Sequence, residues 1–327
     1  MKIVQISNNK LTVPPRAYGG TQRDIYYLTE ELIRRGHEVV LFAKKGSNAH
    51  ATQTFEYPFD DNNSDKIYRF IMQHLPQDVD IIHDHTGIVS RTDPPIPTIR
   101  NSHLRKKTIG SRYPVYVSKT ILEKYGENIG YYVHNGIRLA DYKFREKKGD
   151  YLLFLGRLTP EKGVHLAIEV ARKTGLDLII AGPYEHNKKQ MKYYKEVIRP
   201  QLDKQIRYVG NVGGKKKQDL LSKARCVLFP SIWDEPFGLV LIESLACGTP
   251  VLGFKYGGAV REVLHGLPQL LCNNVLDMAI KVLTRKDFPA PQVCRNYVEQ
   301  HFTDRVMTDN FLKLYKKIIE IHKGEES

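Results

Sequence analysis

The sequence lacks any long hydrophobic run. No apolar segment approaches the length of about eighteen residues that marks a membrane-spanning helix. The first seven residues have neither a long apolar stretch nor a small-residue cleavage site, so they read as a strand and not as a signal peptide. We therefore expect a cytoplasmic protein.

Cysteine is scarce, and its placement argues against a zinc site. The four cysteines, Cys226, Cys247, Cys272 and Cys294, occur at no metal-ligand spacing. Because Cys226 and Cys247 lie within apolar segments, buried free thiols are favoured over disulfides.

Acidic residues are outnumbered by basic ones. The chain has 36 Asp and Glu against 50 Lys and Arg, which gives a formal net charge of +14. Such an excess favours nucleic acid, an anionic membrane or a phosphate-bearing substrate as the partner, and charge alone does not choose among them. No helix-turn-helix, zinc-finger or aromatic RNA-binding motif is present, so nucleic acid is not the expected partner.

Length and pattern indicate an α/β protein with two domains. The 327 residues exceed what one hydrophobic core usually supports. Strand-like and helix-like segments alternate along the chain, which is typical of parallel sheets. Residues 21–35, for example, are predicted to form a helix, because Ile25, Leu28 and Leu32 share one face.

The alternating pattern starts again near the middle of the chain. A polar break at residues 147–150 precedes an apolar run that resembles a new first strand. Two Rossmann-like domains are therefore predicted, at 1–145 and 146–304. A final amphipathic helix at 305–327 needs a surface to pack on, and we expect it to return to the first domain.

Two glutamates around a Pro-Phe-Gly turn form the strongest candidate site. Glu235 follows a predicted strand, at the edge where open α/β sheets bind ligands, and Glu243 falls about one turn into the next helix. A carboxylate can accept two hydrogen bonds from a vicinal diol, so the pair suits a sugar and a ribose. The amides of Phe237, Gly238 and Leu239 at the helix start suit an anionic ligand. The alternative is a helix cap followed by a solvent-facing glutamate, and the apolar character of the helix argues against it.

This segment resembles the two-glutamate signature of the family-4 retaining glycosyltransferases, which have the GT-B fold. Four further segments resemble motifs of that family in the same order: the glycine-rich loop at 14–22, the histidine motif at 81–85, the Asn-Gly-Ile motif at 135–137 and the basic phosphate clamp at 156–163. The resemblance covers nearly the whole chain. It implies two Rossmann-like domains whose parallel sheets face an interdomain cleft.

The resemblance implies roles on the donor side. Arg157 and Lys162 hold the diphosphate and stabilise it as a leaving group, Arg157 through its planar fork and Lys162 as a point charge. Glu235 contacts hydroxyls of the donor sugar, and Glu243 contacts the ribose. Arg207 aligns with a position near the nucleotide in some relatives. The alternative for the two cations is an ordinary solvated surface.

Further implied site residues belong to the first domain. Gly19 and Gly20 precede its first helix and let a phosphate or sugar approach the backbone, although a tight turn without a ligand is the alternative. Tyr18 lines the same pocket. His85 ends a predicted strand and is implied to contact the transferred sugar, unless it is a structural histidine, and His103 is a candidate on the acceptor side.

The implied reaction moves a hexose from a nucleotide-diphosphate sugar to a hydroxyl of a glycan, a lipid-linked carrier or a small molecule, with retention of configuration. A phosphorylase or a sucrose-type synthase on the same fold stays open. Asp78 and Asp80 offer an Asp-x-Asp pattern, but they precede their strand, so we expect no essential metal. No cofactor is expected beyond the nucleotide sugar, which is a co-substrate.

Three basic clusters leave a membrane partner open. Charged runs are usually solvated faces, but each Lys or Arg near an anionic membrane adds about 1 kcal/mol of attraction. Attachment to the inner face of the membrane is therefore an alternative to a freely cytoplasmic protein. The clusters are Arg100 with Arg105, Lys106 and Lys107; Lys188 with Lys189, Lys192 and Lys195; and Lys215 with Lys216 and Lys217.

Overall fold

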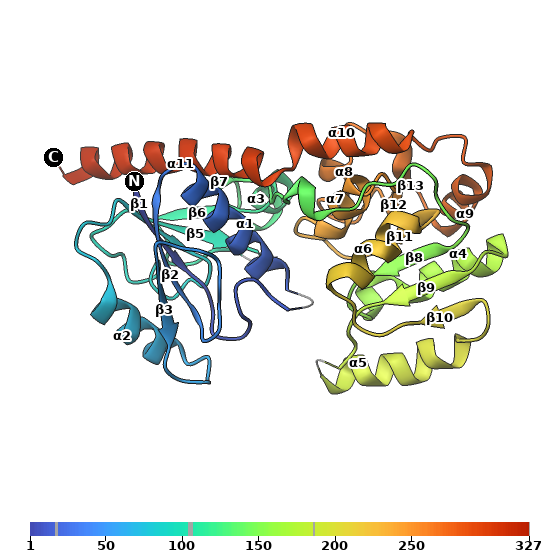
Figure 1. The fold of residues 1–327 in the computed structure, drawn as a ribbon, viewed down its shortest axis with the longest axis horizontal. Coiled ribbons are helices and arrows are strands. Elements are labelled where there is room, and N and C mark those ends of the chain that lie inside the picture. Colours follow the sequence, from blue (N-terminus) through green and yellow to red (C-terminus); the bar gives the residue numbers. More distant parts are fainter. Residues whose placement is uncertain (17–18, 104–106, 186, 327) are drawn as a thin grey trace. The chain divides into compact units, whose positions relative to one another are not determined.

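The computed structural model describes residues 1–16, 19–103, 107–185 and 187–326 (Figure 1). The chain divides into two compact units, which are described separately. Unit 1 comprises Met1–Arg138 and Thr303–Ser327, and unit 2 comprises Leu139–Phe302. The domain boundaries predicted from the sequence are 145 and 304.

Unit 1 is built on a seven-stranded sheet in the order β3-β2-β1-β4-β5-β6-β7, in which every neighbouring pair is parallel. Its central strands are almost wholly buried, as expected where helices cover both faces of a sheet. The strands are β1 (Lys2–Ile6), β2 (Glu38–Lys44), β3 (Gln53–Tyr57), β4 (Ile81–Asp84), β5 (Thr98–Ser102), β6 (Tyr113–Tyr116) and β7 (Tyr131–Tyr132).

The helices of unit 1 include the final helix of the chain. They are α1 (Gly20–Arg34), α2 (Ser64–His74), α3 (Lys119–Tyr125) and α11 (Asp304–Glu326). Helix α11 packs beside α1 and buries Phe311, Tyr315 and Ile318 in the core of this unit (Figure 1). The Tyr315 hydroxyl lies 2.7 Å from Nδ1 of His83 on β4, so the last helix contacts the centre of the sheet.

Unit 2 is built on a six-stranded sheet in the order β10-β9-β8-β11-β12-β13, again with parallel neighbours throughout. Two parallel sheets in an α/β chain confirm the predicted fold class. The strands are β8 (Leu152–Leu155), β9 (Leu178–Ala181), β10 (Ile206–Tyr208), β11 (Cys226–Phe229), β12 (Val251–Phe254) and β13 (Leu271–Cys272).

The helices of unit 2 pack in pairs as well as on the sheet. Helix α4 lies against α9, and α7 lies against α10. The helices are α4 (Val164–Thr174), α5 (Lys188–Tyr193), α6 (Gly214–Lys223), α7 (Leu239–Ala246), α8 (Val260–Val263), α9 (Val275–Thr284) and α10 (Pro291–His301). Helix α5 continues through a π-helical segment, Tyr194–Ile198, and a 3₁₀ turn, Arg199–Gln201.

Two expectations from the sequence concern the state of the cysteines and the presence of membrane-spanning helices. All four cysteines are buried free thiols, which confirms the interpretation of their apolar surroundings. Among the helices in the described ranges, none is both long enough and apolar enough to cross a bilayer.

Candidate functional site

The strand order of unit 2 reverses between β8 and β11, which makes the carboxyl edge of these two strands the place where open α/β sheets bind ligands. The loop after β8 carries Arg157 and Lys162, and the loop after β11 carries Trp233 and Glu235. Segments that are some seventy residues apart in the sequence are thus brought to one point of the sheet.

A buried ion pair forms the centre of this cluster. The Lys162 ammonium donates to Oε2 of Glu235, and the two side chains are only 10% and 9% exposed. The indole Nε1 of Trp233 donates to the same oxygen at 2.9 Å. Neither charge is easily reached by water, so each depends on the other for stabilisation.

Two cations lie over the ring of Trp233. Nζ of Lys162 is 4.9 Å from the ring centroid, and the guanidinium carbon of Arg157 is 5.8 Å from it. Together with the single carboxylate of Glu235 the cluster carries one excess positive charge. An anion is therefore the ligand that this arrangement favours.

Glycine is required where the two loops meet. Gly163 has φ +73°, and a Cβ at this position would lie 2.0 Å from the carbonyl oxygen of Pro230. A larger residue would therefore push apart the segments that carry Lys162 and Glu235. Gly238 has φ +91° and begins α7 directly after the second loop.

Three helices that follow the central strands begin without a capping side chain. Helices α1, α4 and α7 start after Gly19, Gly163 and Gly238, which have no side chain to accept from the amides of the first turn. Helices α6, α8 and α10 also lack a capping side chain, whereas α2, α3, α5 and α9 are capped by Asn63, Ser118, Asn187 and Asn274. The uncapped amides suit an anionic ligand, which is the role that the sequence predicts for Gly19, Gly20, Phe237, Gly238 and Leu239.

The second glutamate has a buried ion pair of its own. Glu243 is 3% exposed, and its Oε1 accepts from Nζ of Lys217 at 2.6 Å and from the Tyr142 hydroxyl at 2.9 Å. Glu243 is therefore not the solvent-facing helical residue of the alternative interpretation. Tyr142 and Lys217 were not singled out as its partners by the sequence, because neither lies within one helical turn of it.

In unit 1 the strand order reverses between β1 and β4, and a chain of polar side chains lies at that point. Nδ1 of His85 is 3.3 Å from Nε2 of His103, and its Nε2 is 3.1 Å from Oε1 of Gln5. Nε2 of Gln5 in turn donates to the Thr29 hydroxyl at 2.9 Å. Nδ1 of His103 is 3.7 Å from the Asp24 carboxylate. The structure thus brings the two predicted histidines together.

Burial keeps these histidines neutral. It lowers the pKa of His103 to about 4 and holds the pKa of His85 well below its usual value, with further lowering by neighbouring His83 and His103. Both ring nitrogens of His85 face protein atoms. A direct hydrogen bond from this ring to a sugar would therefore replace one of the contacts to Gln5 or His103.

The neighbouring carboxylate of Asp84 has a structural role. Its two oxygens accept five hydrogen bonds, from the amides of Thr86, Gly87, Val89 and Ser90 and from the Thr86 hydroxyl. This carboxylate shapes the loop after β4. Its lone pairs are already used, so it is a poor nucleophile.

Several predicted residues lie elsewhere. Arg207 is on the edge strand β10, is exposed and pairs with Asp177 at 3.4 Å, so the structure does not bring it to Arg157 and Lys162. Tyr18 lies outside the described residues, as do Arg105 and Lys106. Asp78 pairs with Lys2 at 2.8 Å before β4 begins. Within the described ranges, no group of three or more His, Cys, Asp or Glu side chains is placed to hold a metal ion.

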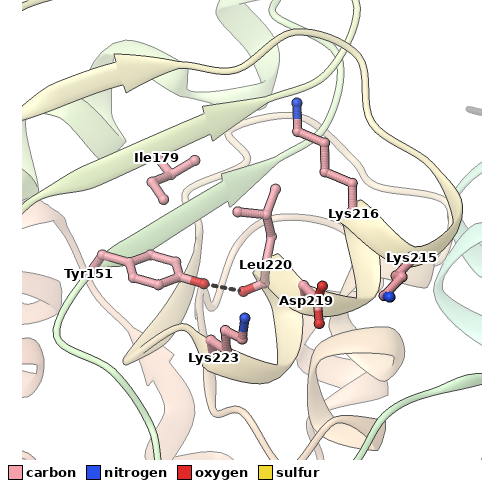
Figure 2. A pocket seen from close by; sticks show the side chains of 7 residues that line it. All are labelled: Tyr151, Ile179, Lys215, Lys216, Asp219, Leu220 and Lys223. Atoms are coloured by element: carbon pink, nitrogen blue, oxygen red, sulfur yellow. Dashed lines mark hydrogen bonds between the residues drawn. The ribbon is translucent and has the colours of Figure 1, made fainter.

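A separate open cavity of about 400 Å³ lies between α6 and strands β8 and β9. Figure 2 shows its apolar floor of Tyr151, Ile179 and Leu220, with lysines of α6 around it. The Tyr151 hydroxyl donates to the Leu220 carbonyl at 2.8 Å. None of its lining residues belongs to the cluster around Glu235, so the cavity is not part of that site.

Two family matches cover most of the chain. The family described as Glycosyltransferase Family 4 matches residues 18–141, and the one described as Glycosyl transferases group 1 matches residues 140–286. The chain belongs to the family-4 glycosyltransferases. The resemblance drawn from the five sequence motifs is thereby confirmed.

Individual glycosyltransferases are similar to this chain over different lengths. AviGT4, a glycosyltransferase involved in avilamycin A biosynthesis, has a solved structure with a TM-score of 0.81 and 25% identity, covering 98% of each chain. The Anabaena protein HepE, solved in complex with UDP-glucose, shares the fold at a TM-score of 0.75 and 15% identity, covering 97% of this chain and 100% of that one. Glycogen synthase of Mycobacterium tuberculosis is 34% identical over 48% of this chain, and the match spans only 40% of that relative's own length.

Proposed function

We propose that this glycosyltransferase moves a hexose from a nucleoside-diphosphate sugar to a hydroxyl acceptor with retention of configuration and without an essential metal ion. The observation that carries the proposal is the convergence of Arg157, Lys162, Trp233 and Glu235 at the strand reversal of unit 2. The site offers cations for a diphosphate beside a carboxylate for hydroxyl groups.

The diphosphate is assigned to Arg157, Lys162 and the uncapped start of α7. Negative charge builds up on the leaving group as the glycosidic bond breaks, and fixed cations in a site with little water stabilise that charge strongly. A guanidinium can contact two phosphate oxygens at once, whereas an ammonium acts as a single point charge. The amides after Gly238 add donors without adding a counter-charge.

The two rings of the donor are assigned to the two glutamates. In Glu235 both donors converge on Oε2, and no described side chain donates to Oε1. Glu243 has the same pattern, because Lys217 and Tyr142 both bind its Oε1. Each carboxylate thus keeps one oxygen that can accept from a sugar or ribose hydroxyl.

Unit 1 is assigned to the acceptor and to the transferred sugar. His85 and His103 lie where the strand order of unit 1 reverses, in the row of polar side chains that includes Gln5. Both histidines are neutral, so they act as hydrogen-bonding groups and not as cations. We assign deprotonation of the acceptor hydroxyl to an oxygen of the departing diphosphate, with a sugar or a lipid-linked sugar as the acceptor.

The similar proteins support a nucleotide-sugar donor. HepE was solved with UDP-glucose, AviGT4 is a glycosyltransferase, and the similar Mycobacterium tuberculosis protein is a glycogen synthase. The base, the hexose and the acceptor of this chain are open to direct assay.

The test is a transfer assay with a panel of UDP-, GDP- and ADP-sugars and hydroxyl acceptors. We expect release of the nucleoside diphosphate, a product with the donor's anomeric configuration by proton NMR, and undiminished rates in EDTA. Arg157→Gln should reduce kcat/KM at least a hundredfold, and Arg207→Gln is the matched control, since Arg207 lies on the exposed edge strand. Turnover only when inorganic phosphate replaces the hydroxyl acceptor would identify a phosphorylase instead, and an inverted product would refute retention.

We propose an anionic membrane as a second partner, because much of the excess positive charge is concentrated in one segment of the chain. Residues 185–225 contain twelve Lys and Arg against four Asp and Glu, so this segment carries +8 of the net +14. Lys188 and Lys189 at the start of α5 are both exposed. Flotation with vesicles containing an anionic lipid should recover the protein at low salt, and Lys188→Glu with Lys189→Glu should weaken recovery. Lys313→Glu on α11 is the control, and equal loss in both variants would contradict a role for this segment.

A further inference from the structure

Two donors of different kinds share one oxygen of Glu235. The Lys162 ammonium and the Trp233 indole N–H both bind Oε2, the indole at 2.9 Å. One donor carries a full charge, and the other is neutral. A diphosphate that enters the site affects the two donors differently.

The diphosphate competes with Glu235 for Lys162. It carries more negative charge than one carboxylate, so the ammonium is drawn toward it, and the ion pair with Glu235 weakens. Glu235 is only 7% exposed, and a buried carboxylate that loses its cation needs another hydrogen-bond donor to stay in place. The neutral indole N–H has no net charge for the diphosphate to attract.

Backbone hydrogen bonds hold the segment around Trp233 on both sides. The amide of Ile232 donates to the Glu161 carbonyl at 3.0 Å, and the amide of Glu235 donates to the Gly257 carbonyl at 3.3 Å. The amide of Ala259 donates back to the Glu235 carbonyl at 2.9 Å. These hydrogen bonds tie the backbone on both sides of Trp233, so an exchange of partners at Glu235 needs only side-chain movement.

We infer that Trp233 is a positioning residue that keeps Glu235 directed at the donor sugar after Lys162 has turned to the diphosphate. The inference rests on the proposed function. In the empty site both donors hold Glu235, and in the loaded site the indole N–H becomes its main support. Because Trp233 acts in this way only when the donor is bound, kinetic measurements can distinguish the role from a purely structural one.

Trp233→Phe tests this inference, because phenylalanine keeps an aromatic ring under the two cations and removes the N–H donor. We expect kcat to fall roughly tenfold, equivalent to about 1.4 kcal/mol, with the KM for the donor changed less than twofold. The loss should fall on kcat because Lys162 still holds Glu235 before the donor binds. An unchanged kcat, or a higher KM at unchanged kcat, would overturn the inference.

A second measurement uses the wild-type protein and does not depend on folding of the variant. Trp233 is the only tryptophan of the chain, so its fluorescence reports the cation over its ring and the carboxylate at its N–H. Titration with the nucleoside diphosphate should change the emission saturably, with the same midpoint as calorimetric binding. Calorimetric binding without a fluorescence change would overturn the exchange of Lys162, whereas a wild-type protein that transfers no sugar would overturn the proposed function instead.

Discussion

Removal of one member of the ion pair between Lys162 and Glu235 should lower the free energy of unfolding by a measurable amount. Lys162→Met removes the cation and leaves a carboxylate that is 9% exposed, with the neutral Trp233 N–H as its remaining partner. Removing one member of a buried pair costs about 3–5 kcal/mol, because the other charge is left uncompensated. We therefore expect Lys162→Met to lower the free energy of unfolding of unit 2 by an amount in that range.

The double variant separates the charge effect from a loss of packing. Glu235→Gln in the Lys162→Met background removes the stranded charge, and the new amide oxygen can still accept from the indole. Most of the lost stability should then return, although activity stays absent in both variants. A packing defect at position 162 predicts the opposite, a double variant at least as unstable as the single one.

Urea unfolding provides the assay. The fluorescence of Trp233, the only tryptophan, reports unit 2, and far-ultraviolet circular dichroism reports both units. The midpoint should shift without a change in m, since the surface exposed on unfolding stays the same. If Lys162→Met unfolds at the wild-type urea concentration, or if Glu235→Gln fails to restore the midpoint, the reasoning about this pair is refuted.

Three further predictions concern other parts of the chain. The pKa of His103 lies near 4 in the folded protein and near 6.5 in the unfolded one, so the unfolded state binds more protons and stability falls as pH drops from 6.5 toward 4, by up to about 3 kcal/mol. Denaturant titrations across this range should show a shallower fall for His103→Gln, and an unchanged slope would contradict the assignment. Gly163→Ala should cost more than about 1 kcal/mol, because of its positive φ and the Pro230 carbonyl 2.0 Å from the added Cβ, and a normal melting temperature would count against this geometry. Arg207→Ala should leave kcat/KM within twofold, since its exposed side chain pairs with Asp177, and a tenfold loss would return Arg207 to the donor site.

The repeated α/β pattern of the sequence was sufficient to predict the fold class, because strands buried on both faces read as short apolar runs. The helix predicted at 21–35 is α1, within one residue at each end. Strand β3 does not show that pattern, because it is an edge strand in which only Tyr57 is fully buried. Helix α2 had a readable signal in the Asn63 cap and the spacing of Ile67 and Ile71, although only these two residues are fully buried.

The partners of the site residues could not be predicted in the same way. The motifs predicted Lys162 and Glu235 as donor-site residues, but no sequence rule connects a lysine to a carboxylate 73 residues away. The same holds for Lys217 with Glu243 and for Asp24 with His103. Such pairs depend on which strands become neighbours at the reversal of the sheet, and that order is set by packing of the whole domain.

Calorimetric titration with UDP, GDP and ADP tests the central claim most directly, because the account assigns a diphosphate to Arg157 and Lys162 in unit 2. We predict that at least one of the three binds the wild-type protein at a single site, and that Arg157→Gln and Lys162→Gln each weaken this binding at least tenfold. Binding of equal strength in all three proteins, or no binding of any nucleoside diphosphate to the wild type, would contradict the account.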